Sequence, residues 1–186
     1  MKYVALLRGI NVGGNRSVRM NDLKQICESL NFSHVTTYLQ SGNVVFEART
    51  GPSEILADKL EKALFQRYRF EVKVHVKTAG EWSDVVSKNP LQREKNIDKS
   101  KLHATFLLNH PPGIDDQARR VDDRELQMMK AKEEMIARKG EVIYLYCPKG
   151  YGRSKLNNPS LERKLKAVAT TRNWKTVCAL LELVKA

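Results

Sequence analysis

The chain alternates between short apolar runs and amphipathic stretches, and each change of period predicts a change of secondary structure. Residues 2–8 form an apolar run that ends in a loop rich in glycine and asparagine, which predicts a buried strand. Apolar residues then recur at helical spacing, which predicts a helix with Asn21 as its cap. Residues 35–40 and 44–47 are β-branched and aromatic and flank the turn at residues 41–43, so they predict a hairpin.

A second helix and a last strand complete the first half of the chain. The break at residues 50–53 makes Ser53 the expected helix cap, and the helix continues to about Tyr68. Residues 71–77 alternate valine with polar residues, which predicts a strand buried on one face. The resulting order, β-α-β-β-α-β, is the ferredoxin-like plan.

The second half is expected to repeat this order, although the two halves share no clear sequence similarity. Its predicted elements are a short helix at 79–87, a polar linker at 88–101, a strand at 102–108, a helix from about Asp115, a hairpin of residues 133–137 and 141–147, a helix capped by Asn158 with Pro159 at its first position, and a final helix from Trp174. The predicted fold class is therefore α+β: two ferredoxin-like halves with antiparallel sheets and a C-terminal helix. We expect a first half at 1–78, a helix and polar linker at 79–101, and a second half at 102–186 with the C-terminal helix.

Composition narrows the class of protein. The content of 41% apolar and 29% charged residues suits an ordinary globular domain. The three cysteines include no Cys-x-x-Cys pair, which argues against a disulfide framework or a zinc site and favours a reducing compartment. No apolar run reaches the ~18 residues of a membrane helix. We therefore expect a cytoplasmic protein with no membrane partner, metal or cofactor.

The net charge of +12 is concentrated in two regions. Residues 1–26 hold five Lys/Arg and one acid, and residues 147–175 hold eight Lys/Arg and one acid. Clustered positive charge attracts phosphates and polyanions. The alternative is that the charge serves only solubility.

The glycine-rich loop after the first strand is a candidate anion site. Gly9, Gly13 and Gly14 follow a strand and precede a helix, so their backbone N–H groups can converge on an anion. Their spacing matches neither Gly-x-Gly-x-x-Gly nor the P-loop. The alternative is that these glycines only permit positive φ in a turn.

Polar and basic side chains near both loops extend this candidate site. Arginine can bind phosphate in a bidentate way, and Arg172 is expected in the first turn of a helix, where its charge opposes the helix dipole. Asn173 has the alternative role of a helix cap, and Asn11 and the 40–43 tip have the alternative role of turn residues. The predicted ligand-binding residues are Arg8, Gly9, Asn11, Gly13, Gly14, Gln40, Asn43, Arg153, Ser154, Lys155, Arg172 and Asn173.

No catalytic residues are identified. Asp22 and Glu162 are the only acids in the two basic regions, and neither region contains a histidine, so a pair for acid–base catalysis is missing there. Cys147 ends a strand near the second basic loop and is the candidate reactive thiol.

Four motifs occur in a fixed order along the chain. Residues 6–14 read LLRGINVGG, residues 37–46 read TYLQSGNVVF, residues 152–156 read GRSKL and residues 171–177 read TRNWKTV. Together they resemble the bacterial family called domain of unknown function 1697. The resemblance implies an α+β fold of two ferredoxin-like halves and implies no activity.

We therefore expect a protein that binds a phosphate-bearing ligand, RNA or DNA being the first choice. The alternative is a small-molecule enzyme that acts on a phosphorylated or carboxylated metabolite, for which a deep pocket with buried polar groups would be the sign. A third alternative is a protein-interaction module, which would carry an exposed apolar patch.

Overall fold

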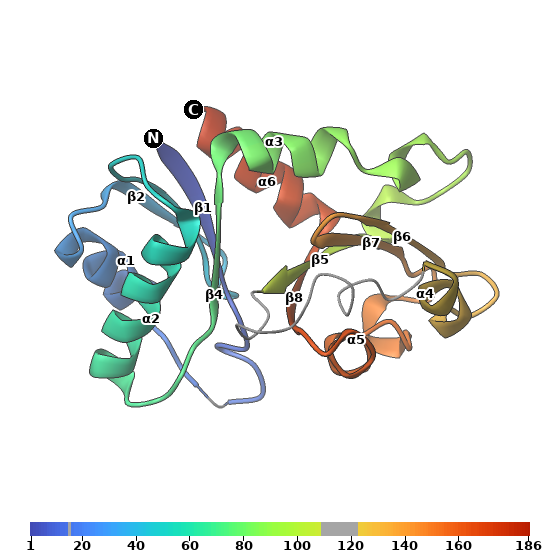
Figure 1. Cartoon of the computed structure of the whole chain (residues 1–186), viewed down its shortest axis with the longest axis horizontal. Coiled ribbons are helices and arrows are strands. Elements are labelled where there is room, and N and C mark those ends of the chain that lie inside the picture. The colour runs from blue at the N-terminus through green and yellow to red at the C-terminus, as the bar shows by residue number, and fades with distance from the viewer. Residues whose placement is uncertain (15, 109–122) are drawn as a thin grey trace. The chain divides into compact units, whose positions relative to one another are not determined.

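The computed structural model describes residues 1–14, 16–108 and 123–186, which form helices and antiparallel sheets (Figure 1). These residues divide into two compact units: Met1–Val86 together with Cys178–Ala186, and Ser87–Val177. Each unit contains one four-stranded sheet. In the described residues, no helix is both long and apolar enough to cross a membrane.

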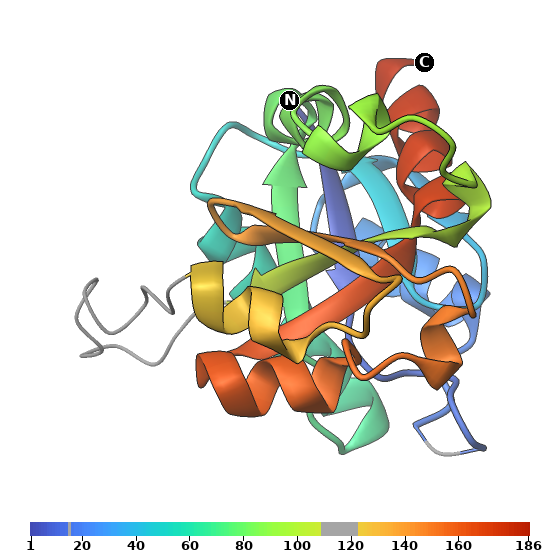
Figure 2. The same cartoon turned by 90° about the vertical axis from the view of Figure 1, so that its right-hand side faces the viewer.

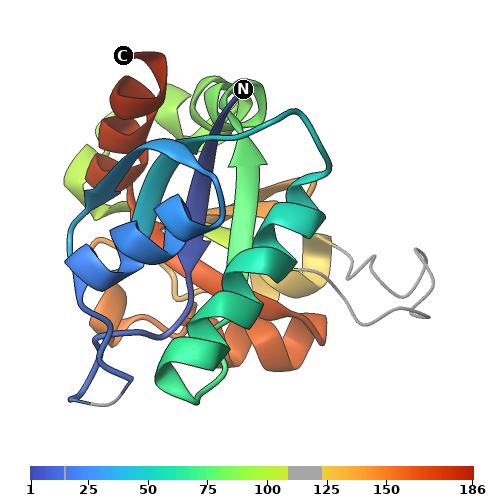
Figure 3. The ribbon, with the colours of Figure 1, turned by 90° about the vertical axis from the view of Figure 1, so that its left-hand side faces the viewer.

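The first unit follows the predicted ferredoxin-like order. Its elements are β1 (Lys2–Leu7), α1 (Met20–Ser29), β2 (Ser33–Tyr38), β3 (Asn43–Glu47), α2 (Ser53–Tyr68), β4 (Val74–Thr78) and α3 (Ala79–Ser87). The strands lie in the order β2-β3-β1-β4, and all neighbours are antiparallel. Helices α1 and α2 contact each other and lie across one face of this sheet (Figure 3).

The core of the first unit lies between these helices and the sheet. Tyr3, Ala5 and Leu7 alternate along β1 on the helix-covered face. The Phe46 ring stacks on that of Phe32, with 4.4 Å between centroids. The other face is buried as well, because His75 and Lys77 of β4 are each only 8% exposed. The expectation of a last strand buried on one face was therefore wrong.

The second unit repeats the plan. Its elements are the 3₁₀ helices η1 (Pro90–Arg93) and η2 (Lys99–Lys101), then β5 (Leu102–Leu108), α4 (Asp123–Met129), β6 (Met135–Lys139), β7 (Val142–Tyr146), the 3₁₀ helix η3 (Tyr151–Arg153), α5 (Asn158–Leu165) and β8 (Val168–Asn173). Helix α6 (Trp174–Lys185) begins in this unit, and its residues from Cys178 onward belong to the first. The strands lie in the order β6-β7-β5-β8, again antiparallel. Helix α4 packs against β6 and α5 against β8 (Figure 2). The fold class predicted from the sequence is confirmed.

Strand β8 is the element that the sequence analysis missed. The helix before it ends at Leu165, and Lys166 adopts left-handed backbone geometry with φ 50°. Residues 168–171 are mostly β-branched, and β8 pairs with β5 along its whole length. Arg172 therefore lies in a strand and not in the first turn of a helix, so the argument from the helix dipole was wrong.

Several helix and strand boundaries in the structure also differ from the predicted ones. Helix α1 begins after Arg19 and α2 after Pro52, and neither has a side-chain cap, so Asn21 and Ser53 are not caps. Asn157, one residue before the predicted cap, accepts a hydrogen bond from Ser160 N at 3.1 Å. Strand β6 begins at Met135, two residues later than predicted, because residues 131–134 form a turn. The start of the helix predicted from Asp115 lies outside the described residues.

Candidate functional site

The predicted site residues of the first unit meet at one end of its sheet. They belong to two segments, residues 8–19 (the glycine loop) and residues 39–43 (the hairpin tip). Leu7 N donates to Gly42 O at 2.8 Å, and Asn11 Nδ2 donates to Gln40 O at 2.7 Å. These bonds bring together Arg8, Gly9, Asn11, Gly13, Gly14, Gln40 and Asn43.

Asn11 organises the glycine loop. Its Nδ2 also donates to Val18 O at 2.9 Å, and its Oδ1 accepts from Val18 N at 2.8 Å. Both amide hydrogens of Asn11 are therefore used within the protein. In the same way, Asn43 is fully buried and its Nδ2 donates to Tyr38 O at 2.7 Å and to Ser41 Oγ at 3.0 Å. The two side chains therefore hold the backbone of the glycine loop and of the hairpin tip in place.

Two arginines of the glycine loop, Arg16 and Arg19, lack an acidic partner among the described residues. Asp22, the one acid of this basic region, bonds Arg67 Nη2 at 3.2 Å and the Tyr68 hydroxyl at 3.1 Å. Among the described residues, neither Arg16 nor Arg19 forms an ion pair, and both side chains are exposed. The loop therefore presents net positive charge.

In the second unit, residues 147–156 form a short ordered segment, the basic turn. Gly150 N donates to Cys147 O at 2.9 Å and Arg153 N donates to Gly150 O at 3.1 Å. Ser154 is buried, and its Oγ accepts from Leu156 N at 2.9 Å, so its hydroxyl holds the turn together. Arg153 and Lys155 project into solvent.

A polar network that the sequence analysis missed anchors the basic turn to the sheet. The Tyr151 hydroxyl donates to Thr171 Oγ1 at 3.1 Å and accepts from Asn158 N at 3.1 Å. Thr171 Oγ1 in turn donates to Asn158 Oδ1 at 2.6 Å, and it lies 2.7 Å from Thr105 Oγ1. Burial raises the pKa of Tyr151, so the phenol stays protonated. No local signal marks this network, because its members come from four segments.

His103 packs against the same tyrosine. The two rings stack with 5.0 Å between centroids, and His103 Nδ1 lies 3.1 Å from Lys101 O. Burial lowers the pKa of His103, so the imidazole is neutral at pH 7 and Nδ1 carries its proton.

Arg172 and Asn173 have internal roles. Arg172 is 8% exposed, and its Nη1 donates to Thr170 Oγ1 at 2.8 Å and to Thr171 O at 3.0 Å. Burial lowers the pKa of this guanidinium to about 10. Asn173 Oδ1 accepts a hydrogen bond from Thr176 N at 2.8 Å. Asn173 therefore caps the helix that follows it, which is the alternative role considered from the sequence.

Two of the three cysteines, Cys147 and Cys27, are buried. Cys147 is buried and burial raises its pKa, so its thiol is poorly suited to be a nucleophile. Burial raises the pKa of Cys27 to about 12. Across the described ranges, no three His, Cys, Asp or Glu residues are grouped to hold a metal ion.

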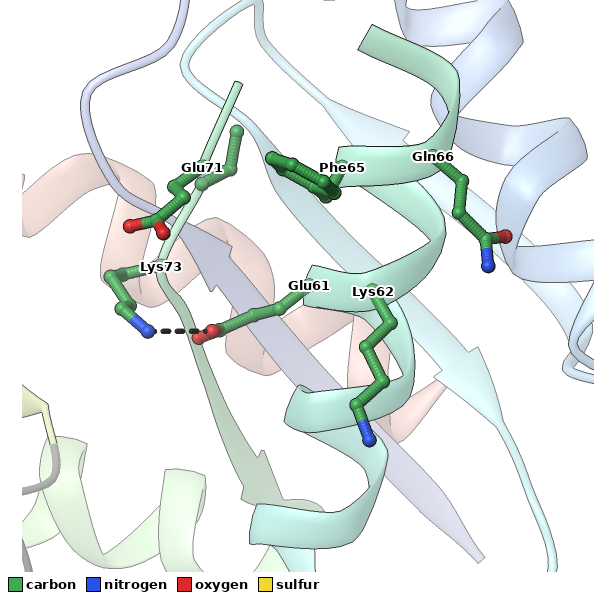
Figure 4. A pocket seen from close by; sticks show the side chains of 7 residues that line it. Glu61, Lys62, Phe65, Gln66, Glu71 and Lys73 are labelled. Carbon is green, nitrogen blue, oxygen red and sulfur yellow. Dashed lines mark hydrogen bonds and ion pairs between the residues drawn. The ribbon is translucent and has the colours of Figure 1, made fainter. Parts of the chain in front are cut away.

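A cavity of about 330 Å³ lies in the first unit between α2 and the segment that leads into β4 (Figure 4). Glu61 and Lys73 point toward each other across it, with 2.9 Å between Oε2 and Nζ. The Glu61 carboxylate raises the pKa of Lys73. The Phe65 ring points from the helix toward the facing segment. Two acids and two lysines line this cavity, so its charge is balanced and it does not favour anions.

The twelve predicted residues thus form two groups, seven in the first unit and five in the second. In the first group, Gly9, Gly13, Gly14 and Gln40 are exposed, whereas Asn43 is fully buried. In the second group Arg153 and Lys155 are exposed, whereas Ser154 and Arg172 are buried.

Comparison with known proteins agrees with this architecture. A conserved bacterial protein of Streptococcus pneumoniae, SP0830, has a similar solved structure with a TM-score of 0.73, 21% sequence identity and coverage of 98% of each chain. At this identity the likeness concerns the fold. A comparison with curated proteins finds no match. The model of the family described as "Protein of unknown function (DUF1697)" matches residues 1–144, which include the glycine loop and the hairpin tip and end before the two C-terminal motifs. The chain therefore belongs to the DUF1697 family.

Proposed function

We propose that the protein binds a phosphate-bearing ligand, RNA or DNA being the first choice, through the exposed cations of the glycine loop and the basic turn. One observation carries this proposal: the acids of both basic regions are engaged elsewhere. Asp22 bonds Arg67 and Tyr68, and Glu162 Oε1 accepts from the backbone N–H of Ala169 at 2.7 Å. The exposed cations without an ion-pair partner among the described residues, Arg16, Arg19, Arg153 and Lys155, are suited to backbone phosphates.

The basic turn supports this proposal in a second way. Arg153 and Lys155 lie on a segment that the Tyr151 network holds in place, so little backbone freedom is lost when they bind a ligand. Among the described residues, neither side chain forms an ion pair.

Fluorescence anisotropy with labelled single- and double-stranded DNA and RNA, across a salt series, tests the proposal. We expect the logarithm of the association constant to fall linearly with the logarithm of salt concentration. Arg153→Glu/Lys155→Glu should weaken binding by about tenfold or more, and the two lost phosphate contacts should lower the salt slope by roughly two.

The matched control is Lys95→Glu/Lys99→Glu, which makes the same change of charge at exposed lysines outside both basic regions. If the control weakens binding as much as the test variant, binding follows net charge alone and the proposed surface is wrong. Absence of binding at low salt would exclude nucleic acid.

The alternative, a small-molecule enzyme for a phosphorylated or carboxylated metabolite, is favoured by the partly buried hydroxyl network of Tyr151 and Thr171. Tyr151→Phe removes the phenol hydroxyl and keeps the ring that stacks on His103. If the oligonucleotides bind equally well to this variant, the network has no part in nucleic-acid binding, and phosphorylated metabolites become the ligands to screen.

A further inference from the structure

A cavity of about 210 Å³ lies beside the basic turn in the second unit. One wall is the turn at residues 131–134, and the other is formed by residues after β7. The residues that line it are Ala131, Lys132, Glu133, Glu134, Pro148, Lys149 and Arg153.

The two acids of this cavity already have partners. Glu134 is buried, and its Oε2 accepts from Ala131 N at 2.9 Å, which closes the turn. Glu133 Oε2 lies 3.2 Å from Lys149 Nζ, so these two charges neutralise each other.

Two cations remain. Lys132 and Arg153 are exposed, and neither forms an ion pair with any residue that the structure describes. The cavity therefore combines a concave shape with a net charge of +1, because its lining holds three cations, Lys132, Lys149 and Arg153, and two carboxylates. A guanidinium presents its donors in a fork that matches phosphate oxygens.

The wall that carries Arg153 is held in place before any ligand binds. The backbone bonds of Gly150 and Arg153 close the basic turn, and the Tyr151 ring stacks on His103 of β5. Because the backbone that carries Arg153 is fixed, binding of an anion costs less backbone conformational entropy than it would on a mobile segment.

Size and charge together select the kind of phosphate. A phosphate inside a nucleic-acid backbone continues on both sides and carries one charge, whereas a terminal phosphate monoester has one free end and nearly two charges at pH 7. We propose that this cavity binds a terminal phosphate monoester, with Arg153 and Lys132 as its cations. This inference rests on the proposed function and narrows it: the monoester is the end of a nucleic-acid strand or the phosphate of a small metabolite.

The first experiment uses one DNA oligonucleotide in three forms, with a phosphate at the 5′ end, at the 3′ end or at neither. The parent protein should bind one phosphorylated form about tenfold more tightly than the unphosphorylated form, as one charge-assisted contact supports. Arg153→Gln and Lys132→Gln should remove this preference. Lys155→Gln, a change at an exposed cation outside the cavity lining, should weaken all forms alike and keep the preference.

The second experiment titrates the ¹⁵N-labelled protein with inorganic phosphate and with glucose 6-phosphate. Shifts of the amides at 131–134 and 149–153 in the parent, absent in Arg153→Gln, are expected. If the small phosphates bind there and no oligonucleotide binds, the cavity proposal stands with a metabolite as the source, and the nucleic-acid function fails. If the oligonucleotides bind without preference for a terminal phosphate and the small phosphates shift none of these amides, the cavity proposal is overturned and the nucleic-acid function stands.

Discussion

Gly42 and Gly13 both have positive φ, 72° and 62°, but their surroundings differ. A Cβ on Gly42 would lie 2.6 Å from Ile10 Cδ1 and 2.8 Å from Leu7 Cβ, whereas a Cβ on Gly13 would meet no atom within 4 Å. The glycine at the hairpin tip is therefore required by packing, and the glycine in the loop is required by backbone geometry alone.

This difference gives a prediction at the residue scale. Gly42→Ala should lower the free energy of unfolding by about 3 kcal/mol, because it adds overpacking to backbone strain. Gly13→Ala should lower it by only about 1 kcal/mol, from strain alone. Urea denaturation of both variants measures the two values. Equal losses of unfolding free energy would show that the residues around the hairpin tip move to accommodate the added methyl group.

His75 gives the protein a dependence on pH. Burial, with the nearby Lys77 charge, lowers the pKa of His75 to about 3. Below pH 6.5 the unfolded chain binds a proton at this histidine that the folded chain does not bind, so stability falls as the pH falls, until the pH approaches the folded pKa.

We expect the parent protein to lose about 2 kcal/mol more stability than His75→Gln between pH 6.5 and pH 4.5. Denaturation curves at several pH values measure the difference, and carboxylates that titrate in both proteins cancel in the comparison. Parallel stability profiles would mean that His75 takes up its proton in the folded protein.

At the scale of elements, both halves protect the edge of their last strand in the same way. Strands β4 and β8 are edge strands, and each follows a helix that supplies a carboxylate. Glu61 Oε1 of α2 accepts from Val74 N at 2.8 Å, and Glu162 Oε1 of α5 accepts from Ala169 N at 2.7 Å. A carboxylate on an outward N–H removes a group with which another chain could pair.

Glu61→Ala should therefore lower the free energy of unfolding by about 1–2 kcal/mol, because it leaves the amide of Val74 without its acceptor. Glu61→Gln keeps an acceptor and loses only the exposed pair with Lys73, so it should cost less than about 1 kcal/mol. Hydrogen exchange at the Val74 amide should become faster in the alanine variant and change little in the glutamine variant. An unchanged exchange rate in both would show that the carboxylate does not protect this edge.

At the scale of the whole molecule, the last helix connects distant parts of the sequence. Residues Cys178–Ala186 belong to the first compact unit although they follow the second in the chain. Leu180 in this segment is fully buried, whereas Leu183 on the same helix is partly exposed. Each unit also contains one buried tryptophan, Trp82 in the first and Trp174 in the second.

Leu180→Ala should destabilise the first unit by about 2–4 kcal/mol, because it leaves a cavity at a fully buried position. The fluorescence of Trp82, measured in a Trp174→Phe background, reports the unfolding of this unit. Leu183→Ala is the matched control and should cost clearly less. Equal effects of the two substitutions would contradict the burial of Leu180.

Much of the candidate site was predictable as a set of residues, but not as an arrangement. The glycine loop and the hairpin tip each have a local signal, namely glycines after a strand and a polar turn between β-branched runs. Their convergence depends on the bond between Asn11 and Gln40, which are distant in sequence. The Tyr151 network and the cavity beside Arg153 depend on side chains from several segments, so no local pattern indicates them.

The sequence by itself determined the order of most elements, because period, turn residues and β-branched runs act over a few neighbours. It was enough to predict β5 and α3 at their observed bounds and the ferredoxin-like order of the first half, whereas the last strand of the second half was missed. Only the tertiary structure decided that residues 168–173 form a strand. The helical pattern before these residues gives no sign of a strand, and the strand forms because it pairs with β5, which is far away in the sequence. The tertiary structure also decided which polar residues are structural and which are exposed, because burial of Ser154 and Arg172 follows from packing between segments far apart in the chain.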